Sequence, residues 1–335
     1  MTEAIKKPSY LNLYHAGELA RRAKTLMTRL ESCDICPREC HCNRMEGGRG
    51  FCNSGYLPQV AAACDHHGEE PVISGSNGTG AIFFGSCNMS CIYCQNHAIS
   101  QPPPGRYNHE TSCSALAERM LYLQDELACH NISFVSPSHF VPQLVQAVLE
   151  AVPLGLHVPL IYNTNGYDSV ASIRALEGII DIYLPDLKYA SGRRAAELSA
   201  TPDYVARSRR AIQEMYRQMG DKLVTDENGL ATRGIIVRHL VLPGRLAGSN
   251  ASLTWLARHL SAKVTVSIMS QYYPAHHAHL FPPLNRKLSA AEYAGVLQVV
   301  DRLGLENGWV QELAAAESYQ PHFMGEGHPF SPEQA

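Results

Sequence analysis

Short apolar runs alternate with longer amphipathic stretches along most of this sequence. A short apolar run bounded by turn residues is typical of a buried strand. Such runs span residues 81–84, 131–136, 158–163, 179–184, 234–242 and 264–270. Between and after them, apolar residues at steps of three and four predict helices over residues 114–127, 141–151, 169–176, 204–219, 253–260 and 290–303. Strands and helices that alternate at this spacing predict a parallel sheet with right-handed crossovers.

A cysteine-rich segment precedes the first of these strands, after a predicted helix over residues 16–31. Four of its cysteines flank a glycine-rich turn at residues 47–50; they are Cys33, Cys36, Cys40 and Cys52. Glycine adopts backbone conformations that other residues resist, so thiolates on both sides of this turn can converge on one ion. Four thiolates suit zinc or an auxiliary iron–sulfur cluster, and sulfur ligands alone do not separate the two. The third alternative is a metal-free set of reduced thiols.

Three more cysteines follow the first predicted strand at spacings of three and two residues. The run Cys87-x3-Cys91-x2-Cys94 forms a loop too tight for ordinary disulfide pairing. Three thiolates on one loop can hold three irons of a [4Fe–4S] cluster and leave the fourth iron without a protein ligand. The alternative is a structural zinc knuckle, which would be one ligand short. The cysteines outside both groups are predicted to be buried small hydrophobic residues; they are Cys42, Cys64, Cys113 and Cys129.

The loop resembles the cluster motif of the radical S-adenosylmethionine (radical SAM) enzymes. It has an aromatic residue, Tyr93, directly before the third cysteine, and a predicted strand directly before the first. Residues 94–101 continue it in a way that resembles the branch related to pyruvate formate-lyase activating enzymes. The resemblance implies a partial (β/α)6 TIM-like barrel with a small cysteine-rich N-terminal segment. It also implies that SAM binds the open iron and is cleaved to methionine and a 5′-deoxyadenosyl radical, which abstracts hydrogen from the substrate.

Cofactor-binding residues at the strand ends follow from the same resemblance. Asp186 and Lys188 belong to an Asp-Leu-Lys segment like that of the branch, where the aspartate helps to hold a cation beside the SAM carboxylate and the lysine contacts SAM. Asn163 stands where the branch has aspartate in an Asp-Thr-Asn-Gly segment. The remaining candidates are Tyr93, Ser136, Ser138 and Arg238. The arginine is a second candidate for the SAM carboxylate, and the serines stand where many family members bind the SAM amino group through an acidic residue.

Composition limits the class of protein. The chain has 335 residues, 45% hydrophobic and 18% charged, and a formal net charge of -3, which is ordinary for a globular protein and gives no global attraction for nucleic acid. No apolar run approaches the ~20 residues that span a bilayer, and residues 1–7 lack the apolar region of a signal peptide. An odd count of 11 clustered cysteines favours thiolate ligation in a reducing compartment over disulfides. We therefore expect a cytoplasmic protein without a membrane or nucleic-acid partner.

These observations predict an N-terminal helix and metal-binding segment at residues 1–78, a core barrel at 79–310 and a tail at 311–335. The first functional hypothesis is a radical SAM enzyme that acts on a protein, most simply an activase of a glycyl-radical enzyme. It would require SAM and a low-potential reductant such as flavodoxin or ferredoxin. The alternatives are a radical SAM enzyme with another protein or a small molecule as substrate, and a non-enzymatic iron–sulfur electron carrier or sensor.

Overall fold

One sheet runs through the computed structural model, which describes residues 7–102, 109–313, 321–323 and 327–330. Its strands follow the order β1-β2-β3-β4-β5-β7-β8-β9, and β6 pairs with β7 at the side. They are β1 (Val60–His66), β2 (Thr79–Phe84), β3 (Ile132–Val135), β4 (Leu160–Thr164), β5 (Ile182–Pro185), β6 (Val224–Thr225), β7 (Ala231–Leu240), β8 (Thr265–Met269) and β9 (Gly308–Val310). Every pairing along this order from β2 to β9 is parallel, whereas β1 runs antiparallel to β2.

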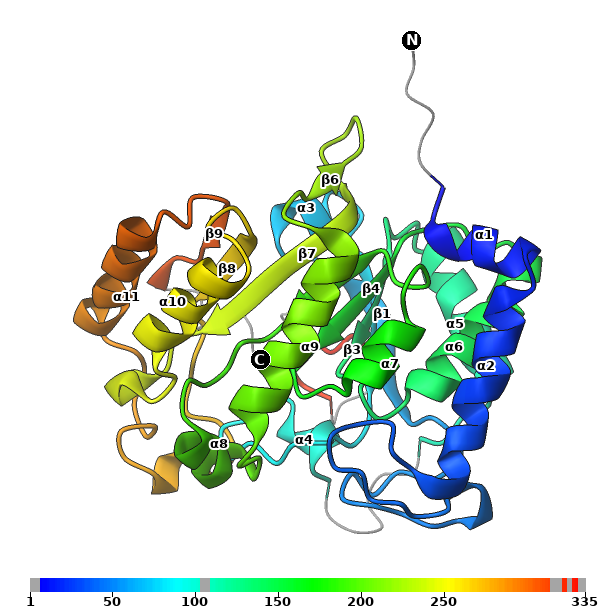
Figure 1. Ribbon diagram of the computed structural model, residues 1–335, viewed down its shortest axis with the longest axis horizontal. Helices are drawn as coiled ribbons and strands as arrows, with labels where there is room; N and C mark the ends of the chain where they lie inside the picture. Colours follow the sequence, from blue (N-terminus) through cyan, green and yellow to red (C-terminus); the bar gives the residue numbers. More distant parts are fainter. Residues whose placement is uncertain (1–6, 103–108, 314–320, 324–326, 331–335) are drawn as a thin grey trace.

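Helices connect the parallel strands and cover the outer face of the sheet, as Figure 1 shows for α5, α6, α7 and α9. The α-helices are α1 (Ser9–His15), α2 (Glu18–Thr28), α3 (Pro71–Ser74), α4 (His97–Ser100), α5 (Cys113–Asp125), α6 (Val141–Ala151), α7 (Val170–Ala175), α8 (Gly192–Ser199), α9 (Tyr204–Met219), α10 (Ser249–His259) and α11 (Ala290–Leu303). The predicted α/β class, with a mostly parallel sheet and a cysteine-rich N-terminal segment, is confirmed.

The two faces of the sheet have different neighbours because successive residues of a strand point to opposite sides. In β2, Ile82 and Phe84 pack in the main hydrophobic core with the helices, while Ala81 and Phe83 belong to a separate cluster on the inner face. The inner face carries polar residues as well, among them Asn163 of β4. A helix-covered outer face and a partly polar inner face place any binding site on the inside of the curved sheet.

Three strands join the sheet that the six predicted runs left out. Strand β6 has only two residues and pairs with β7. Strand β1 comes from the segment predicted as N-terminal, so the sheet begins before residue 79. Only Val60 and Cys64 of its seven residues are buried, so the strand leaves a weak apolar pattern. Strand β9 has only three residues, two of them exposed, and lies at the other edge. Short edge strands bury little apolar surface and therefore leave a weak signal in the sequence.

None of the helices in the described ranges is both long enough and apolar enough to cross a membrane.

Candidate active site

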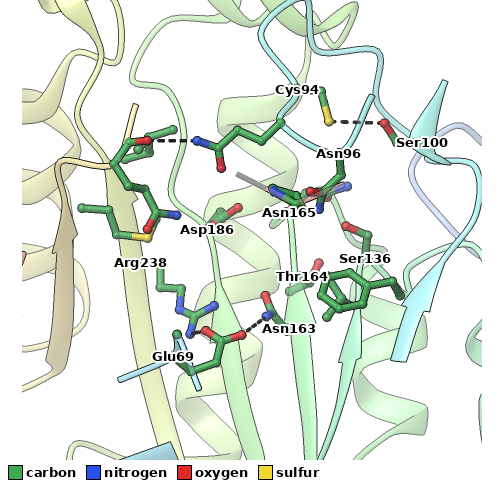
Figure 2. Close-up of a pocket in the computed structure, with 18 of the residues that line it drawn as sticks. Glu69, Cys94, Asn96, Ser100, Ser136, Asn163, Thr164, Asn165, Asp186 and Arg238 are labelled. Carbon is green, nitrogen blue, oxygen red and sulfur yellow. Dashed lines mark hydrogen bonds and ion pairs between the residues drawn. The ribbon is translucent and has the colours of Figure 1, made fainter. Parts of the chain in front are cut away.

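A cavity of about 500 Å³ opens on the inner face of the sheet, toward the carboxyl ends of the parallel strands. Residues just beyond four successive strands line it: Cys87 after β2, Ser136 after β3, Asn165 after β4 and Asp186 after β5. Figure 2 shows several of these side chains converging on one space. The carboxyl ends of parallel strands meet at one edge of a sheet, so residues far apart in the sequence come together there.

All three cysteines of the motif line this cavity, and each sulfur has a hydrogen-bonding neighbour. Asn165 Nδ2 donates to Cys87 Sγ at 3.4 Å, and Ser199 Oγ donates to Cys91 Sγ at 3.0 Å. The hydroxyl of Ser100 lies 3.2 Å from Cys94 Sγ, as Figure 2 shows. Hydrogen bonds to sulfur are a means by which proteins tune iron–sulfur clusters, so the surroundings of the three thiols fit that group.

The free thiols do not ionise readily in this environment. Burial, with a smaller contribution from the neighbouring Cys91, raises the pKa of Cys87 to about 12. Burial likewise raises the pKa of Cys91 to about 11, although Lys188 opposes the shift. A bound metal would have to stabilise the thiolate forms, as it does in metal sites generally.

No group of three His, Cys, Asp or Glu side chains in the described ranges is arranged to hold a single metal ion. A [4Fe–4S] cluster makes a different demand, because each thiolate binds its own iron and the sulfurs need not meet at one point. Cys87, Cys91 and Cys94 would each bind one iron of such a cluster.

Lys188 and Asp186 form a partly buried ion pair in the wall of the cavity, with 2.6 Å between Lys188 Nζ and Asp186 Oδ2. Burial lowers the pKa of the lysine, but Asp186 and Cys91 outweigh it and the net shift is upward, so the ammonium keeps its charge. Tyr204 fixes the backbone here: its hydroxyl donates to the Asp186 carbonyl at 2.8 Å and accepts from the Lys188 amide at 3.0 Å. The Lys188 ammonium is therefore a positive charge held in place beside the cysteines.

Arg238 also lines the cavity, but two carboxylates that sequence analysis missed already hold it. It forms ion pairs with Glu69 and with Glu70, and its Nε donates to Glu70 Oε1 at 3.0 Å. Asn163 Nδ2 donates to Glu69 Oε1 at 3.2 Å, so all four residues form one polar layer, part of which Figure 2 shows. The carboxylate of SAM would have to share this arginine with Glu69 and Glu70. The available signal was Arg238 itself, since an arginine inside an apolar strand requires buried acceptors.

The two candidate serines have different environments. Ser136 lines the cavity and adopts a left-handed backbone conformation, with φ of 55°. Ser86, just before the first cysteine of the motif, is left-handed as well, with φ of 65°. Ser138 is buried away from the cavity, and its hydroxyl lies 3.2 Å from Thr164 Oγ1. Only Ser136 of the two predicted serines is therefore placed to contact a ligand in the cavity.

Tyr93 lines the cavity and starts a chain of hydroxyl groups. Its hydroxyl lies 2.6 Å from that of Tyr189, which lies 2.6 Å from Ser199 Oγ. Because Ser199 donates to Cys91, the chain ends on a sulfur of the motif. The hydroxyl of Tyr93 is thus fixed by the protein, and its ring face forms part of the cavity wall.

The C-terminal segment contributes to the same cavity. Pro321 and Phe330 line it, and the ring of Phe330 lies 4.2 Å from that of His66 and 5.8 Å from that of Phe83. No motif in the sequence predicted this contact, because a single aromatic residue in a Pro- and Gly-rich tail resembles many surface loops.

The N-terminal cysteines lie outside this cavity and line a small one of their own, of about 10 Å³. The wall includes Cys42 together with the four predicted ligands. The prediction that Cys42 is an unrelated buried residue was therefore wrong. Its position two residues beyond Cys40 was the available signal. All 11 cysteines of the chain are free.

Comparisons with known proteins find similar proteins but do not assign the chain to a family. No family model matches it. It is 28% identical over 288 residues to the uncharacterized protein MJ0674 of Methanocaldococcus jannaschii, an alignment that covers 82% of this chain and 76% of that protein. A second protein of the same organism, MJ0808, is 28% identical over 159 residues, or 43% of this chain and 46% of the relative.

Two solved structures are similar in outline. HydG, a maturase of the [FeFe]-hydrogenase, superposes with a TM-score of 0.48 at 11% identity, over 72% of this chain and 53% of its own. Methylornithine synthase (PylB) superposes with a TM-score of 0.42 at 16% identity, over 69% of this chain and 63% of its own.

Proposed function

We propose that this protein is a radical SAM enzyme that holds a [4Fe–4S] cluster on Cys87, Cys91 and Cys94. The observation that carries the proposal is the set of three thiols, each beside a hydrogen-bonding group, on the wall of a cavity of about 500 Å³. Pockets of roughly 300–1,000 Å³ are typical for small molecules and cofactors. The cavity is therefore large enough for SAM next to the cluster.

A reduced cluster supplies the electron that cleaves the sulfonium of SAM to methionine and a 5′-deoxyadenosyl radical. The residues of this chain bind and orient SAM for that step. Lys188 offers a permanent positive charge to the SAM carboxylate, and Asp186 holds the ammonium in place at 2.6 Å. A buried carboxylate needs such a partner, because losing its hydration without one is costly.

Other polar groups serve the rest of SAM. Ser136 and Asn163 line the cavity and offer hydrogen bonds to the amino group and the ribose, and the Tyr93 ring offers an apolar surface. Arg238 remains a second candidate for the carboxylate, shared with Glu69 and Glu70.

The substrate that we propose is a protein, most simply a glycyl-radical enzyme whose backbone glycine loses hydrogen. Support comes from the resemblance of residues 94–101 and of the Asp186-Leu187-Lys188 segment to the activating enzymes. The electron donor would be flavodoxin or ferredoxin, and the enzyme would work in the cytoplasm. Another protein or a small molecule is the alternative substrate.

Anaerobic reconstitution with iron and sulfide, followed by SAM and dithionite, tests the enzyme activity. Methionine and 5′-deoxyadenosine should appear together in equal amounts. A cluster-loaded sample that forms neither would contradict the proposal and favour an electron carrier. An electron carrier has no need for polar side chains at successive strand ends around a cavity.

The substrate class needs a separate experiment. Peptides with glycine deuterated at the α-carbon are supplied with SAM and reductant. Transfer of deuterium into 5′-deoxyadenosine, detected by mass spectrometry, supports hydrogen abstraction from a polypeptide glycine. SAM cleavage without deuterium transfer from any glycyl peptide or glycyl-radical enzyme would direct the search to small molecules.

A further inference from the structure

The small cavity under the cysteine-rich segment has features that neither an apolar core nor the proposed active site explains. Five cysteines line it: Cys33, Cys36, Cys40, Cys42 and Cys52. Its volume of about 10 Å³ is comparable to the space that one water molecule occupies. A space of this size suits a single ion and is too small for a four-iron cluster.

A fully buried arginine stands at this cavity without a carboxylate partner among the described residues. Arg44 is 1% exposed. Its Nε and Nη2 donate to the Gly55 carbonyl at 2.9 and 2.7 Å, and its Nη1 donates to the His139 carbonyl at 2.7 Å. The same Nη1 lies 3.9 Å from Cys33 Sγ. A buried cation that pairs with no carboxylate indicates negative charge nearby, and the adjacent groups able to carry it are the thiols.

A second arginine and a histidine leave polar atoms unsatisfied at the same wall. Arg38 Nη2 and His139 Nδ1 are buried and have no hydrogen-bond partner, and both residues line the cavity. Buried polar atoms in native proteins nearly always have partners. The guanidinium atom requires an acceptor, and a thiolate sulfur of the cavity would be one. The unsatisfied Arg38 atom therefore indicates a missing acceptor at the site, whereas His139 Nδ1, whose ring donates from Nε2 to the Gly85 carbonyl, is a lone pair that no thiolate would satisfy.

We propose that this cavity binds one Zn²⁺ through the thiolates of Cys33, Cys36, Cys40 and Cys52. Four thiolates around Zn²⁺ leave a charge of −2, which the two guanidinium groups of Arg38 and Arg44 balance. Each thiol that binds loses its proton to solvent, and no electrons are transferred. In the structure no three of these thiols yet meet at single-ion distances, so their side chains turn about the Cα–Cβ bond to close on the ion.

The zinc site would also position the cluster loop. Arg38 Nε donates to the carbonyl of Asn88 at 2.9 Å, and His139 lies with Nε2 3.0 Å from the carbonyl of Gly85. These two carbonyls flank Cys87 in the sequence. Figure 1 shows the loop after α2 at the same end of the molecule as α4, which follows the cysteine motif. Arg38, which balances the charge of the zinc–thiolate group, would thus connect the zinc site to the backbone beside the first cysteine of the active site.

Metal analysis of a variant without the active-site thiols tests the proposal independently of the proposed enzyme activity. The variant Cys87→Ala/Cys91→Ala/Cys94→Ala is purified after growth with zinc and iron. We expect about one zinc and no iron or sulfide per folded chain. Adding Cys36→Ser and Cys52→Ser should remove the zinc, whereas adding Cys113→Ser, on α5 outside the cavity, should not. Iron with sulfide, or a folded chain without metal, would overturn the proposal.

A second measurement uses the wild-type chain, in case the serine variants do not fold. After removal of metal with a chelator, Zn²⁺ is added back and the native protein is alkylated and analysed by mass spectrometry. Cys33 and Cys36 are buried without metal, so the readout is the exposed Cys40 and the partly exposed Cys52, which should become protected together at one equivalent while Cys42 keeps its reactivity. Protection of Cys42 in place of Cys40 would overturn the ligand assignment. Added Co²⁺ should give the absorption of tetrahedral thiolate coordination, and its absence would overturn the site.

Discussion

The two groups of cysteines in this protein use one residue type in opposite ways. The N-terminal group places five thiols around about 10 Å³ and faces two arginines without carboxylate partners. The group at the strand ends places three thiols around about 500 Å³, beside a lysine that already has its aspartate. Structural metal sites saturate the metal with protein ligands, whereas catalytic sites keep a position open.

The comparison teaches that the volume around a set of metal ligands indicates which metal group they bind, as much as the ligands themselves do. The spacing of the N-terminal cysteines alone was compatible with zinc, with an auxiliary cluster or with metal-free thiols. The small volume and the balanced charges favour one ion there. The large volume and the missing fourth ligand favour a cluster with an open iron at Cys87, Cys91 and Cys94.

The largest expected effect separates the two groups directly. Alanine at any one of Cys87, Cys91 and Cys94 should abolish formation of 5′-deoxyadenosine and strip or destabilise the cluster, because each thiolate holds one iron. Iron and sulfide analysis with the visible spectrum measures this. Cys129→Ala, which changes a buried cysteine outside both groups, is the control. A triple variant that keeps a SAM-responsive cluster would disprove the assignment.

A smaller effect is expected from the cation that distinguishes the open site. Lys188→Ala should weaken SAM binding by about 1.5–3 kcal/mol, roughly 10- to 150-fold, through loss of a charged hydrogen bond. The cluster spectrum should remain. Calorimetric titration of the reconstituted protein with SAM gives the affinity, and Lys222→Ala, an exposed lysine, should match the wild type. An unchanged affinity would mean that another group binds the carboxylate.

Gly50 offers a way to disturb the closed site without removing a thiol. A methyl group at this position would lie 2.6 Å from Cys40 Sγ and 3.4 Å from Cys42 Sγ. The same methyl would lie 2.7 Å from Cys40 Cβ, which side-chain rotation does not move, so the backbone at Cys40 has to shift and would carry the sulfur away from the zinc. Gly50→Ala should therefore lower the affinity for zinc by an energy on the order of 1–3 kcal/mol. Competition with a chromophoric chelator measures this, and Gly295→Ala, where the added methyl meets nothing, is the control. Equal zinc affinity in both variants would exclude Cys40 as a ligand.

The smallest effect concerns the hydrogen bonds at the open site. Ser199→Ala removes the donor 3.0 Å from Cys91 Sγ, which should stabilise the reduced, more negative cluster less. Loss of about 1 kcal/mol lowers a one-electron potential by roughly 40 mV. A redox titration followed by electron paramagnetic resonance measures the shift. Ser114→Ala, on an exposed turn of α5, should leave the potential unchanged, and a potential raised in Ser199→Ala would contradict the role given to this serine.

Most of the fold was accessible from the sequence because its parallel strands are buried on both faces. Helices α9 and α11 begin and end where the apolar periodicity placed them, at residues 204–219 and 290–303. The alanine-rich strand β1 and the three-residue strand β9 escaped because their side chains bury little apolar area. Periodicity detects apolar burial and overlooks strands held mainly by backbone hydrogen bonds.

The site was predictable where residues lie close together in the sequence. The cysteine motif and the Asp186–Lys188 pair each occupy a few consecutive positions, and the structure places both in one cavity. The pairing of Arg238 with Glu69 joins residues 169 positions apart, and no local pattern encodes such a distance. The tail residue Phe330 reaches the cavity for the same reason: packing in the folded chain, which spacing does not reveal.

Ser86 and Ser136 follow strands β2 and β3 in a left-handed backbone conformation. Substitutions that relieve this strain to raise the melting temperature would also change the active site. A left-handed conformation costs a residue with a β-carbon roughly 1–2 kcal/mol, which glycine avoids at an entropic cost of about 0.5–1 kcal/mol. At position 136, glycine should leave a small net gain in melting temperature and would remove a polar group from the cavity. At position 86 it would also delete the buried hydrogen bond that Ser86 Oγ donates to Gln59 Oε1 at 2.9 Å, which offsets the gain. Selection for thermal survival and selection for turnover should therefore choose different residues at position 136.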